Sequence, residues 1–385
     1  MRLKYLCTSF SNSLAQQAVN ETGKYRVYGA SGFVGYIDEF GSDVPYLGIV
    51  KDGAGVGRIQ TYKSHTSLLG TLAYIIPNEN ININWLKYSI QALELGKDVG
   101  LTTIPHIYFS DYGNRDIQYV DIGKQHLISA YLDRQCTLID SVIEKTKASI
   151  EEYKKLRQAV ITQAVTKGVR GDRAMKDSGI EWIGEIPEEW EVTRIKNIFS
   201  LRDERNSLPL EEVNLISLYT DKGVLQHSDI EKTTGNKASN ADGYKLVYEN
   251  DIVVNIILCW MGAIGRSAYN GVTSPAYDIY VPSDKIECEY YHHYFRTSGF
   301  SGDCFKRGRG IMLMRWRTYS DQFRDIRVPC PPIEEQREIL AYLNKKSSEI
   351  DSLITKKEHF LTELDSYKKS LIYEYVTGKK EVPQI

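Results

Sequence analysis

The densest group of side chains suited to chemistry lies at residues 306–317, in the stretch KRGRGIMLMRWR. This basic cluster has no acidic residue and contains Lys306, Arg307, Arg309, Arg315, Trp316 and Arg317. Arginines bond phosphates and guanine edges, and glycines let a loop approach a phosphate backbone. The cluster therefore predicts a contact with nucleic acid, and a solvated surface loop is the alternative.

Two Gly-Arg pairs provide a second candidate contact. Arg58 follows KDGAGVG and Arg266 follows CWMGAIG, at corresponding places in the two halves of the chain. An arginine that follows a glycine turn can reach a phosphate or a base edge. Weaker candidates are the isolated lysines Lys63, Lys237 and Lys245.

The glycine-rich stretch DGAGVG, residues 52–57, could instead form a loop that binds a nucleotide cofactor. That fingerprint requires a helix to follow, and RIQTYKSHTS has no helical period. We therefore predict a turn. The sequence contains neither a GxxxxGK[ST] loop for ATP nor the Asn-Pro-Pro-Tyr motif with which adenine methyltransferases hold a flipped base.

No catalytic or metal site is predicted. His292 and His293 are adjacent and the other histidines are scattered, without the converging spacing that a metal requires. Asp140 and Asp351 occupy equivalent places in two similar segments and could be mistaken for paired carboxylates. We predict that each bonds a neighbouring element or a partner.

These candidates belong to a tandem repeat. Residues 125–146 (QHLISAYLDRQCTLIDSVIEKT) and 336–357 (QREILAYLNKKSSEIDSLITKK) are identical at ten of 22 positions, 211 residues apart. Short flanking segments repeat as well, such as Arg115-Asp116-Ile117 against Arg324-Asp325-Ile326. A long-period repeat determines the organisation of the whole chain.

The repeated segments have the period of coiled-coil helices. Apolar residues recur at spacings of three and four, which predicts a stripe that packs on a partner helix. The predicted packing residues are Leu132, Ile139, Ile143 and Ile150 in the first helix, and Leu343, Ile350, Ile354, Leu361 and Leu364 in the second. Packing of each stripe on its own domain is the alternative. Roughly 42 residues make a helix about 60 Å long, which favours pairing of the two helices.

Short connections favour an antiparallel pair with one domain at each end and a pseudo-two-fold relation between the halves. We predict a first domain at 1–122, a helix at 123–170, a linker and second domain at 171–332, and a second helix at 333–379. Residues 167–192, rich in glycine and polar residues, are predicted to be irregular.

The domains are predicted to be α+β. Alternating or apolar runs predict strands at 46–50, 71–77, 251–258 and 276–282, and helices are expected at 83–96 and near 290–297.

Composition is that of ordinary globular domains, with 42% hydrophobic and 25% charged residues. Six cysteines without a Cys-x-x-Cys pair suggest free thiols in the cytoplasm. No apolar run spans a bilayer, and the N-terminal stretch lacks the features of a secretory signal. The net charge of −2 requires that any DNA contact depend on local patches.

The whole chain resembles the specificity subunits of type I restriction-modification systems. The similarity is carried by DSGIEWIGEIPEEWEVTRIKNI (177–198), PCPPIEEQREILAYL (329–343) and the C-terminal LIYEYVTGKKEV. The resemblance implies two target-recognition domains that each read one half of a bipartite asymmetric DNA site. It also implies an antiparallel coiled coil that sets the unread spacer.

The same resemblance implies a subunit without catalytic activity or a cofactor of its own. Its expected partners are double-stranded DNA, two methyltransferase subunits with S-adenosylmethionine, and two motor-nuclease subunits that use ATP and Mg²⁺. Two departures stand out: the first helix begins with VDIGKQHLI, without the Pro-Pro and Glu-Glu of the second, and the first domain lacks a counterpart of KDSGIEWIGEIPEEWEV.

Two other classes of function remain open from the residues alone. The chain could be a coiled-coil adaptor whose end domains bind proteins, or a nuclease with a scattered acidic site. Sequence-dependent DNA binding would separate the first from a specificity subunit, and Mg²⁺-dependent cleavage by the isolated chain would support the second.

Overall fold

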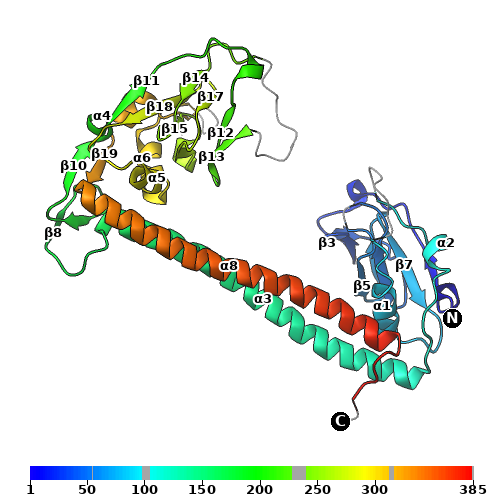
Figure 1. Cartoon of the computed structure of the whole chain (residues 1–385). Helices are drawn as coiled ribbons and strands as arrows, with labels where there is room; N and C mark the ends of the chain where they lie inside the picture. Colours follow the sequence, from blue (N-terminus) through cyan, green and yellow to red (C-terminus); the bar gives the residue numbers. More distant parts are fainter. Residues whose placement is uncertain (54, 98–104, 228–239, 312–315, 384–385) are drawn as a thin grey trace. The chain divides into compact units, whose positions relative to one another are not determined.

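The computed structural model describes residues 1–385 except 54, 98–104, 228–239, 312–315 and 384–385. Short strands and helices are combined with two much longer helices, α3 (Ile122–Lys167) and α8 (Ile333–Val376) (Figure 1). The predicted mixed class with two long helices is therefore confirmed. The chain divides into two compact units, Met1–Ala148 with Lys356–Ile385, and Ser149–Thr355.

The first domain is built on a four-stranded antiparallel sheet. Its order is β1 (Cys7–Phe10), β7 (Leu72–Pro77), β4 (Tyr46–Val50) and β5 (Ile59–Tyr62). Strand β4 lies inside this sheet and all five of its residues are buried, which explains why YLGIV is a continuous apolar run. A second sheet has the order β3 (Gly32–Ile37), β2 (Tyr25–Gly29), β6 (Thr66–Leu68).

Helices of the first domain are short. They are η1 (Leu3–Tyr5), η2 (Gln16–Ala18), α1 (Ile83–Gln91) and α2 (Phe109–Tyr112). Helix α1 begins at the N-cap Asn82, whose side chain accepts a hydrogen bond from the Trp85 amide. It ends five residues before the predicted end at Gly96, because the chain turns where Glu94 has a φ of 49°.

The second domain repeats the sheet. Its order is β11 (Phe199–Arg202), β18 (Tyr277–Pro282), β15 (Ile252–Asn255) and β16 (Ile264–Arg266). Two smaller pairs accompany it, β12 (Ile216–Tyr219) with β13 (Gly223–Gln226), and β14 (Lys245–Val247) with β17 (Gly271–Thr273). The short helices are α4 (Ile195–Ile198), η3 (Leu210–Glu212), η5 (Cys259–Met261), α5 (Cys288–Phe295), α6 (Ser298–Arg307) and α7 (Ser320–Arg324).

The two domains share one topology. In both, the first strand of the large sheet pairs with the last, and the next two strands of the chain form an antiparallel hairpin. Strand β2 runs parallel to β6, and the residue before β12 makes a parallel bridge to β17. The repeated flanking segments also meet in space, since the Leu3 amide bonds the Arg115 carbonyl and the Ile195 amide bonds the Ile326 carbonyl. The sequence repeat is therefore a structural repeat of domains.

Each unit contains part of both long helices, and in each unit the helices run antiparallel. In the first unit Tyr131 contacts Tyr375 and Asp140 pairs with Lys368. In the second, Arg157 pairs with Asp351 and Arg170 with Glu338. The helices also pack on the domains: Leu132 and Leu371 belong to the first domain core, and Val165 and Leu343 to the second.

The segment after α3 is more ordered than we predicted. Residues 167–192 contain a small hairpin of β8 (Met175–Asp177) and β9 (Glu185–Pro187). Ile183, Ile186 and Trp190 from this segment are buried in the second domain core. The prediction of an irregular linker was wrong because its glycines make tight turns between residues that pack inwards. Strand β10 (Glu191–Arg194) then pairs with β19 (Arg327–Cys330).

Candidate nucleic-acid interface

One glutamine in each long helix fixes the domain beside it. Gln125 accepts a hydrogen bond from the Asn82 amide at the start of α1 (2.8 Å) and donates to the Val120 carbonyl (2.8 Å). Gln336 does the same with the Glu287 amide at the start of α5 (2.8 Å) and the Pro331 carbonyl (2.8 Å). Both side chains are fully buried, so each glutamine adds an equivalent contact with main-chain groups to the apolar packing of helix on domain.

A buried carboxylate adds to this joint in the second unit. Glu335 is 1% exposed and accepts hydrogen bonds from the Arg173 guanidinium (2.5 Å) and the Trp190 indole (2.9 Å). A buried carboxylate needs such partners to stay charged. The glutamate-glutamine pair of the PPIEEQ stretch therefore holds the start of α8 against the preceding hairpin.

The basic cluster begins at the end of α6. Lys306 and Arg307 form the last turn of this helix, and Arg309 and Arg317 then face each other in an isolated antiparallel bridge. Arg315 lies outside the described residues. Trp316 stacks on Phe305, with ring centres 5.2 Å apart, and donates its indole N–H to the Phe305 carbonyl (3.1 Å). Any Cβ at Gly308 would lie 2.3 Å from this indole, so the turn requires glycine.

Carboxylates from other parts of the chain accompany these cations. Lys306 pairs with Glu181 (2.5 Å), Arg307 with Asp325 (3.5 Å) and Arg309 with Asp321 (3.9 Å). The ammonium of Lys196 and the guanidinium of Arg194 hold the pKa of Asp325 below its usual range. The cluster is thus less positive than its sequence suggests, although Arg309 keeps 63% of its side chain exposed.

The two Gly-Arg pairs have different surroundings. As predicted, the described glycine-rich residues 55–57 form a turn, and strand β5 rather than a helix follows. The exposed Arg58 bends back toward the Gly55 carbonyl (3.4 Å). Beside it lies a groove of about 930 Å³ within the first unit, also lined by Lys97, Lys368 and Lys369.

Arg266 ends strand β16 and is only partly exposed. Its guanidinium donates to the Asn250 side chain (2.7 Å), and its amide donates to His292 Nδ1 (3.0 Å). Burial first, and the neighbouring His293, Arg296 and Arg266 next, lower the pKa of His292 to about 3. His292 is therefore a neutral acceptor that supports the end of strand β16, so Gly265-Arg266 lies in a strand and not in the turn that we predicted.

The lysine candidates separate in the same way. Lys63 is exposed in the turn between β5 and β6. Lys237 lies outside the described residues. Lys245 is buried and pairs with Asp278 (2.9 Å), so it supports the core of the second domain and cannot reach a ligand without unfolding.

The residues predicted to pack between the helices are all at least partly buried. Leu132, Ile139 and Ile143 share a core cluster with the partly buried Leu361 and Leu364, and Leu343 lies in the core of the second unit. Ile150, Ile350 and Ile354 are buried although they belong to neither domain core.

The two repeated aspartates make equivalent ion pairs. Lys368 Nζ contacts both carboxylate oxygens of Asp140 (2.6 and 2.7 Å), and Arg157 donates to Asp351 (2.7 Å). Asp351 lies 211 residues after Asp140, and Lys368 lies 211 residues after Arg157. The repeat therefore relates the two ion pairs to each other. Both aspartates bond a neighbouring helix, as we predicted.

Among the residues that the structure describes, no cluster of His, Cys, Asp or Glu is arranged to hold a metal ion. No helix in the described ranges is long and apolar enough to cross a membrane.

Sequence reasoning missed one candidate surface, the outward side of the β2–β3 hairpin. It carries Arg26, Tyr28, Phe33 and Tyr36, and Phe33 is 51% exposed. The alternation of outward and inward residues in YRVYG could have indicated it. Arg26 is a single arginine among aromatic residues, so a search for clusters of cations did not find it.

The chain was compared with known proteins. Residues 187–362 match the Type I restriction modification DNA specificity domain. This region, just under half of the chain, is therefore similar to the DNA specificity domain of type I restriction-modification systems. The match runs from the end of β9 through the second domain and into α8 as far as residue 362.

Two proteins named as specificity subunits align over most of the chain. The EcoDI specificity subunit of Escherichia coli is 23% identical over 309 residues, which cover 72% of this chain and 65% of that subunit. The MjaVIII specificity subunit of Methanocaldococcus jannaschii is 21% identical over 356 residues, covering 87% of this chain and 79% of that subunit. This chain thus spans just under two thirds of the EcoDI subunit.

Two solved structures share the fold. A chain from a study of complex assembly and conformational transition of the type I R-M system has a TM-score of 0.67 at 12% identity, covering 99% of this chain and 97% of that one. The HsdS subunit from Thermoanaerobacter tengcongensis has a TM-score of 0.50 at 13% identity, covering 99% and 96%. This chain therefore shares the fold of these two structures at low sequence identity.

Proposed function

We propose that this chain is the sequence-specific DNA-binding subunit of a type I restriction-modification complex. Each of its two domains reads one half of a bipartite, asymmetric site in double-stranded DNA. The helices α3 and α8 set the length of the unread spacer and dock the methyltransferase subunits.

The observation that carries this proposal is the repeat of one domain on two antiparallel helices. Both domains have the same strand order, and the same buried glutamine fixes each of them to its helix. Their outward side chains differ, as expected if they read different sequences. A coiled-coil adaptor that binds proteins needs neither two domains of one topology nor a similarity to a DNA specificity domain.

The chemistry of the complex is assigned to the partners. We propose that this chain binds no cofactor, that two methyltransferase subunits bring S-adenosylmethionine, and that two motor-nuclease subunits bring ATP and Mg²⁺. In this arrangement the chain contributes only recognition and geometry. The basic cluster and the arginines of the Gly-Arg pairs, Arg58 and Arg266, are the proposed phosphate and base contacts, with Lys63 as a further phosphate contact.

A domain exchange tests the proposal. Residues 1–122 are replaced by the first domain of another member of the family, and methylated adenines are mapped in cells that also express the methyltransferase subunit. We expect one half of the methylated motif to change while the other half and the spacer are retained. The matched control exchanges the second domain and should alter only the other half.

A change in both halves after either exchange would contradict modular reading. Absence of any sequence-dependent methylation by the parent complex would contradict the proposed function itself and would favour the adaptor alternative.

A further inference from the structure

The outward side of the β2–β3 hairpin carries an ordered group of side chains, which the partly buried Tyr28 joins to the core through its contact with Tyr62 (ring centres 5.0 Å apart). Arg26 pairs with Tyr36 and Tyr28 with Phe33, so these four side chains share one face, which we call the β2–β3 face. Val27 and Gly29 point the other way and are buried. The register shifts between Val27 and Tyr28, which leaves Val34 as an extra residue that packs inwards.

That bulge has a direct effect on the β2–β3 face. A bulge changes the direction of neighbouring side chains. Phe33 and Tyr36, three residues apart, therefore project from the same side of the edge strand β3. Their rings meet edge to face with centres 5.2 Å apart, and Phe33 meets Tyr28 in the same way at 6.0 Å.

Arg26 lies over this aromatic group. Its guanidinium carbon is 5.7 Å from the centre of the Phe33 ring, within the range of a cation–π contact. The neighbouring hydroxyls of Tyr28 and Tyr36 also interact with this guanidinium and raise its pKa, so the rings and the hydroxyls together orient it. Arg26 makes no ion pair with any residue in the described part of the chain.

Local charge makes this arginine different from the basic cluster. Residues 22–37 contain Lys24 and Arg26 but no Asp or Glu. By contrast, Lys306, Arg307 and Arg309 each have a carboxylate within 4 Å. An exposed arginine without a carboxylate, set among aromatic rings, suits an acceptor-rich ligand with apolar edges, which is the chemistry of base pairs in a groove.

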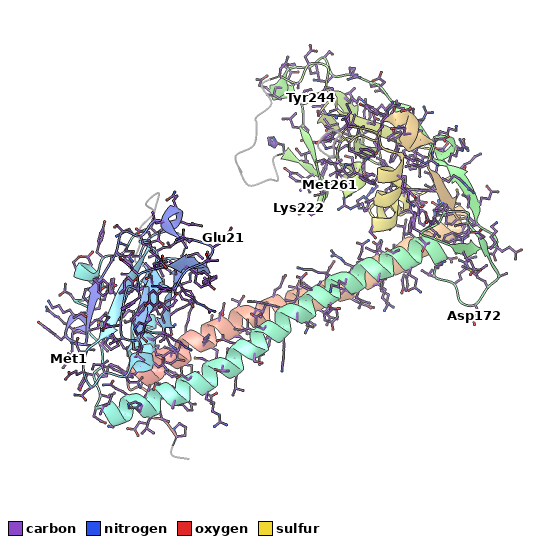
Figure 2. The ribbon with its side chains drawn as sticks, turned by 180° about the vertical axis from the view of Figure 1, so that it is seen from behind. Met1, Glu21, Asp172, Lys222, Tyr244 and Met261 are labelled. Carbon is purple, nitrogen blue, oxygen red and sulfur yellow. The ribbon has the colours of Figure 1, made fainter. Side chains whose placement is uncertain are left out.

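The second domain has the same element with different side chains. Hairpin β12–β13 occupies the equivalent place in the topology, and its buried residues Ile216, Leu218 and Val224 face inwards. Ser217, Tyr219 and Leu225 alternate with them on the outward side. Lys222 lies in the turn between the strands (Figure 2). Two equivalent hairpins with different outward side chains are expected if the two domains read different DNA sequences.

We propose that these two-stranded hairpins enter the major groove and read the bases of the two half-sites. A two-stranded β-ribbon fits the major groove, where each base pair presents a distinct pattern of donors and acceptors. Arg26 bonds the O6 and N7 atoms of a guanine in the first half-site. Phe33 contacts a neighbouring thymine methyl group, and Tyr28 and Tyr36 hold both side chains in place.

This inference rests on the proposed function, since it names the element that does the reading. It is tested on the full chain assembled with its methyltransferase subunit. The variants are Arg26→Ala, Arg26→Lys and Phe33→Ala. Lys4→Ala and Tyr5→Ala are the controls, because Lys4 also lies over an exposed aromatic ring of the first domain, 5.5 Å from its centre. Thermal unfolding checks that each variant keeps its fold.

Binding is measured on duplexes carrying the mapped site and on duplexes substituted at each position. Arg26→Ala should weaken binding to the cognate duplex by about 5- to 150-fold and abolish the preference at one guanine of the first half-site. Arg26→Lys should lose the same preference while retaining affinity for unrelated DNA. Preferences in the second half-site and in both controls should be unchanged.

Two results overturn parts of the argument separately. If the parent complex prefers a bipartite site and the Arg26 and Phe33 variants keep every preference, the hairpin is not the reader while the proposed function stands. If the parent complex shows no sequence preference at all, the proposed function fails and the hairpin proposal fails with it.

Discussion

At the residue scale, burial and pairing separate side chains that look alike in the sequence. Lys245 and Lys63 are both isolated lysines beside strands, yet Lys245 is 8% exposed and paired with Asp278 whereas Lys63 is exposed. His292 is held neutral as an acceptor for the Arg266 amide, while His359 lies exposed on α8. The same residue type thus serves the core in one place and faces solvent in another.

The buried His292 predicts a pH dependence of stability. Its folded pKa of about 3 lies below the unfolded value near 6.5, so the unfolded state takes up the proton first as pH falls. The stabilisation is complete above pH 6.5 and is lost progressively below it. Between pH 7 and pH 5 the free energy of unfolding should fall by about 2 kcal/mol more in the parent than in His292→Gln.

Urea unfolding followed by tryptophan fluorescence measures this difference, because four of the five tryptophans lie in the second unit. His359→Gln on α8 is the control and should keep the pH dependence of the parent. Parallel curves for the parent and His292→Gln would show that this imidazole does not couple folding to pH.

At the element scale, the long helices bury one face and expose the other. Ile139 is 7% exposed and Leu138, its neighbour, is 55% exposed. We predict that Ile139→Ala lowers the free energy of unfolding by about 2–5 kcal/mol, because it removes buried methyl groups and leaves a cavity. Leu138→Ala should change it by about 0.5 kcal/mol or less.

Chemical denaturation of the two variants in parallel makes the comparison. Equal losses from both would mean that α3 is not packed with Ile139 inwards. A Leu138→Ala chain of unchanged stability that assembles poorly with the methyltransferase subunit would instead assign the exposed face to docking.

Helices and strands whose apolar residues recur at a regular spacing could be predicted from the sequence. Contacts between segments that are distant in the chain could not. The spacing of Leu343, Ile350 and Ile354 predicted the second helix, and the run at 46–50 predicted a buried strand. The linker 167–192 was misread, since nothing local reveals that Trp190 meets Glu335. The basic cluster looked uncompensated because its carboxylates, including Glu181, lie far away in the chain.

The candidate site was also only partly predictable. The repeat predicted that Arg58 and Arg266 are equivalent, but it did not predict that they have different hydrogen-bond partners. Arg26 was missed because its significance depends on the pairing of β2 with β3, which brings Phe33 beneath it. Such cross-strand neighbours are fixed by register, and a single bulge changes them.

At the scale of the whole molecule, the repeat relates two domains through two helices of 46 and 44 residues. Each helix is roughly 65–70 Å long at 1.5 Å per residue. In the proposed function, a helix pair of this length is stiff enough to hold the two reading domains apart. The proposed spacer length is therefore a property of the helix pair.

A paired insertion tests this property. Seven residues are added after Ala148 in α3 and seven after His359 in α8, midway between Asp140 and Arg157 and between Asp351 and Lys368. Whole heptads preserve the apolar stripes. The insertion adds about 10 Å, close to three base-pair rises of roughly 3.4 Å each, so the methylated motif should gain about three unread bases.

Mapping of methylated adenines gives the readout, and a seven-residue insertion in α3 alone is the control, which should disrupt both ion pairs and stability. Methylation at the original spacing with undiminished efficiency would show that the helices do not set the spacer.

The buried glutamines have a further consequence for how such a chain can change over time. Gln125 and Gln336 grip only main-chain groups, an amide at the start of a helix and a carbonyl just before their own helix. An incoming domain of unrelated sequence meets this requirement with any residue but proline at that one amide. At these two contacts an exchanged domain therefore needs no particular side chain, and the remaining requirement is an apolar surface that packs on helix residues such as Leu132 and Leu343.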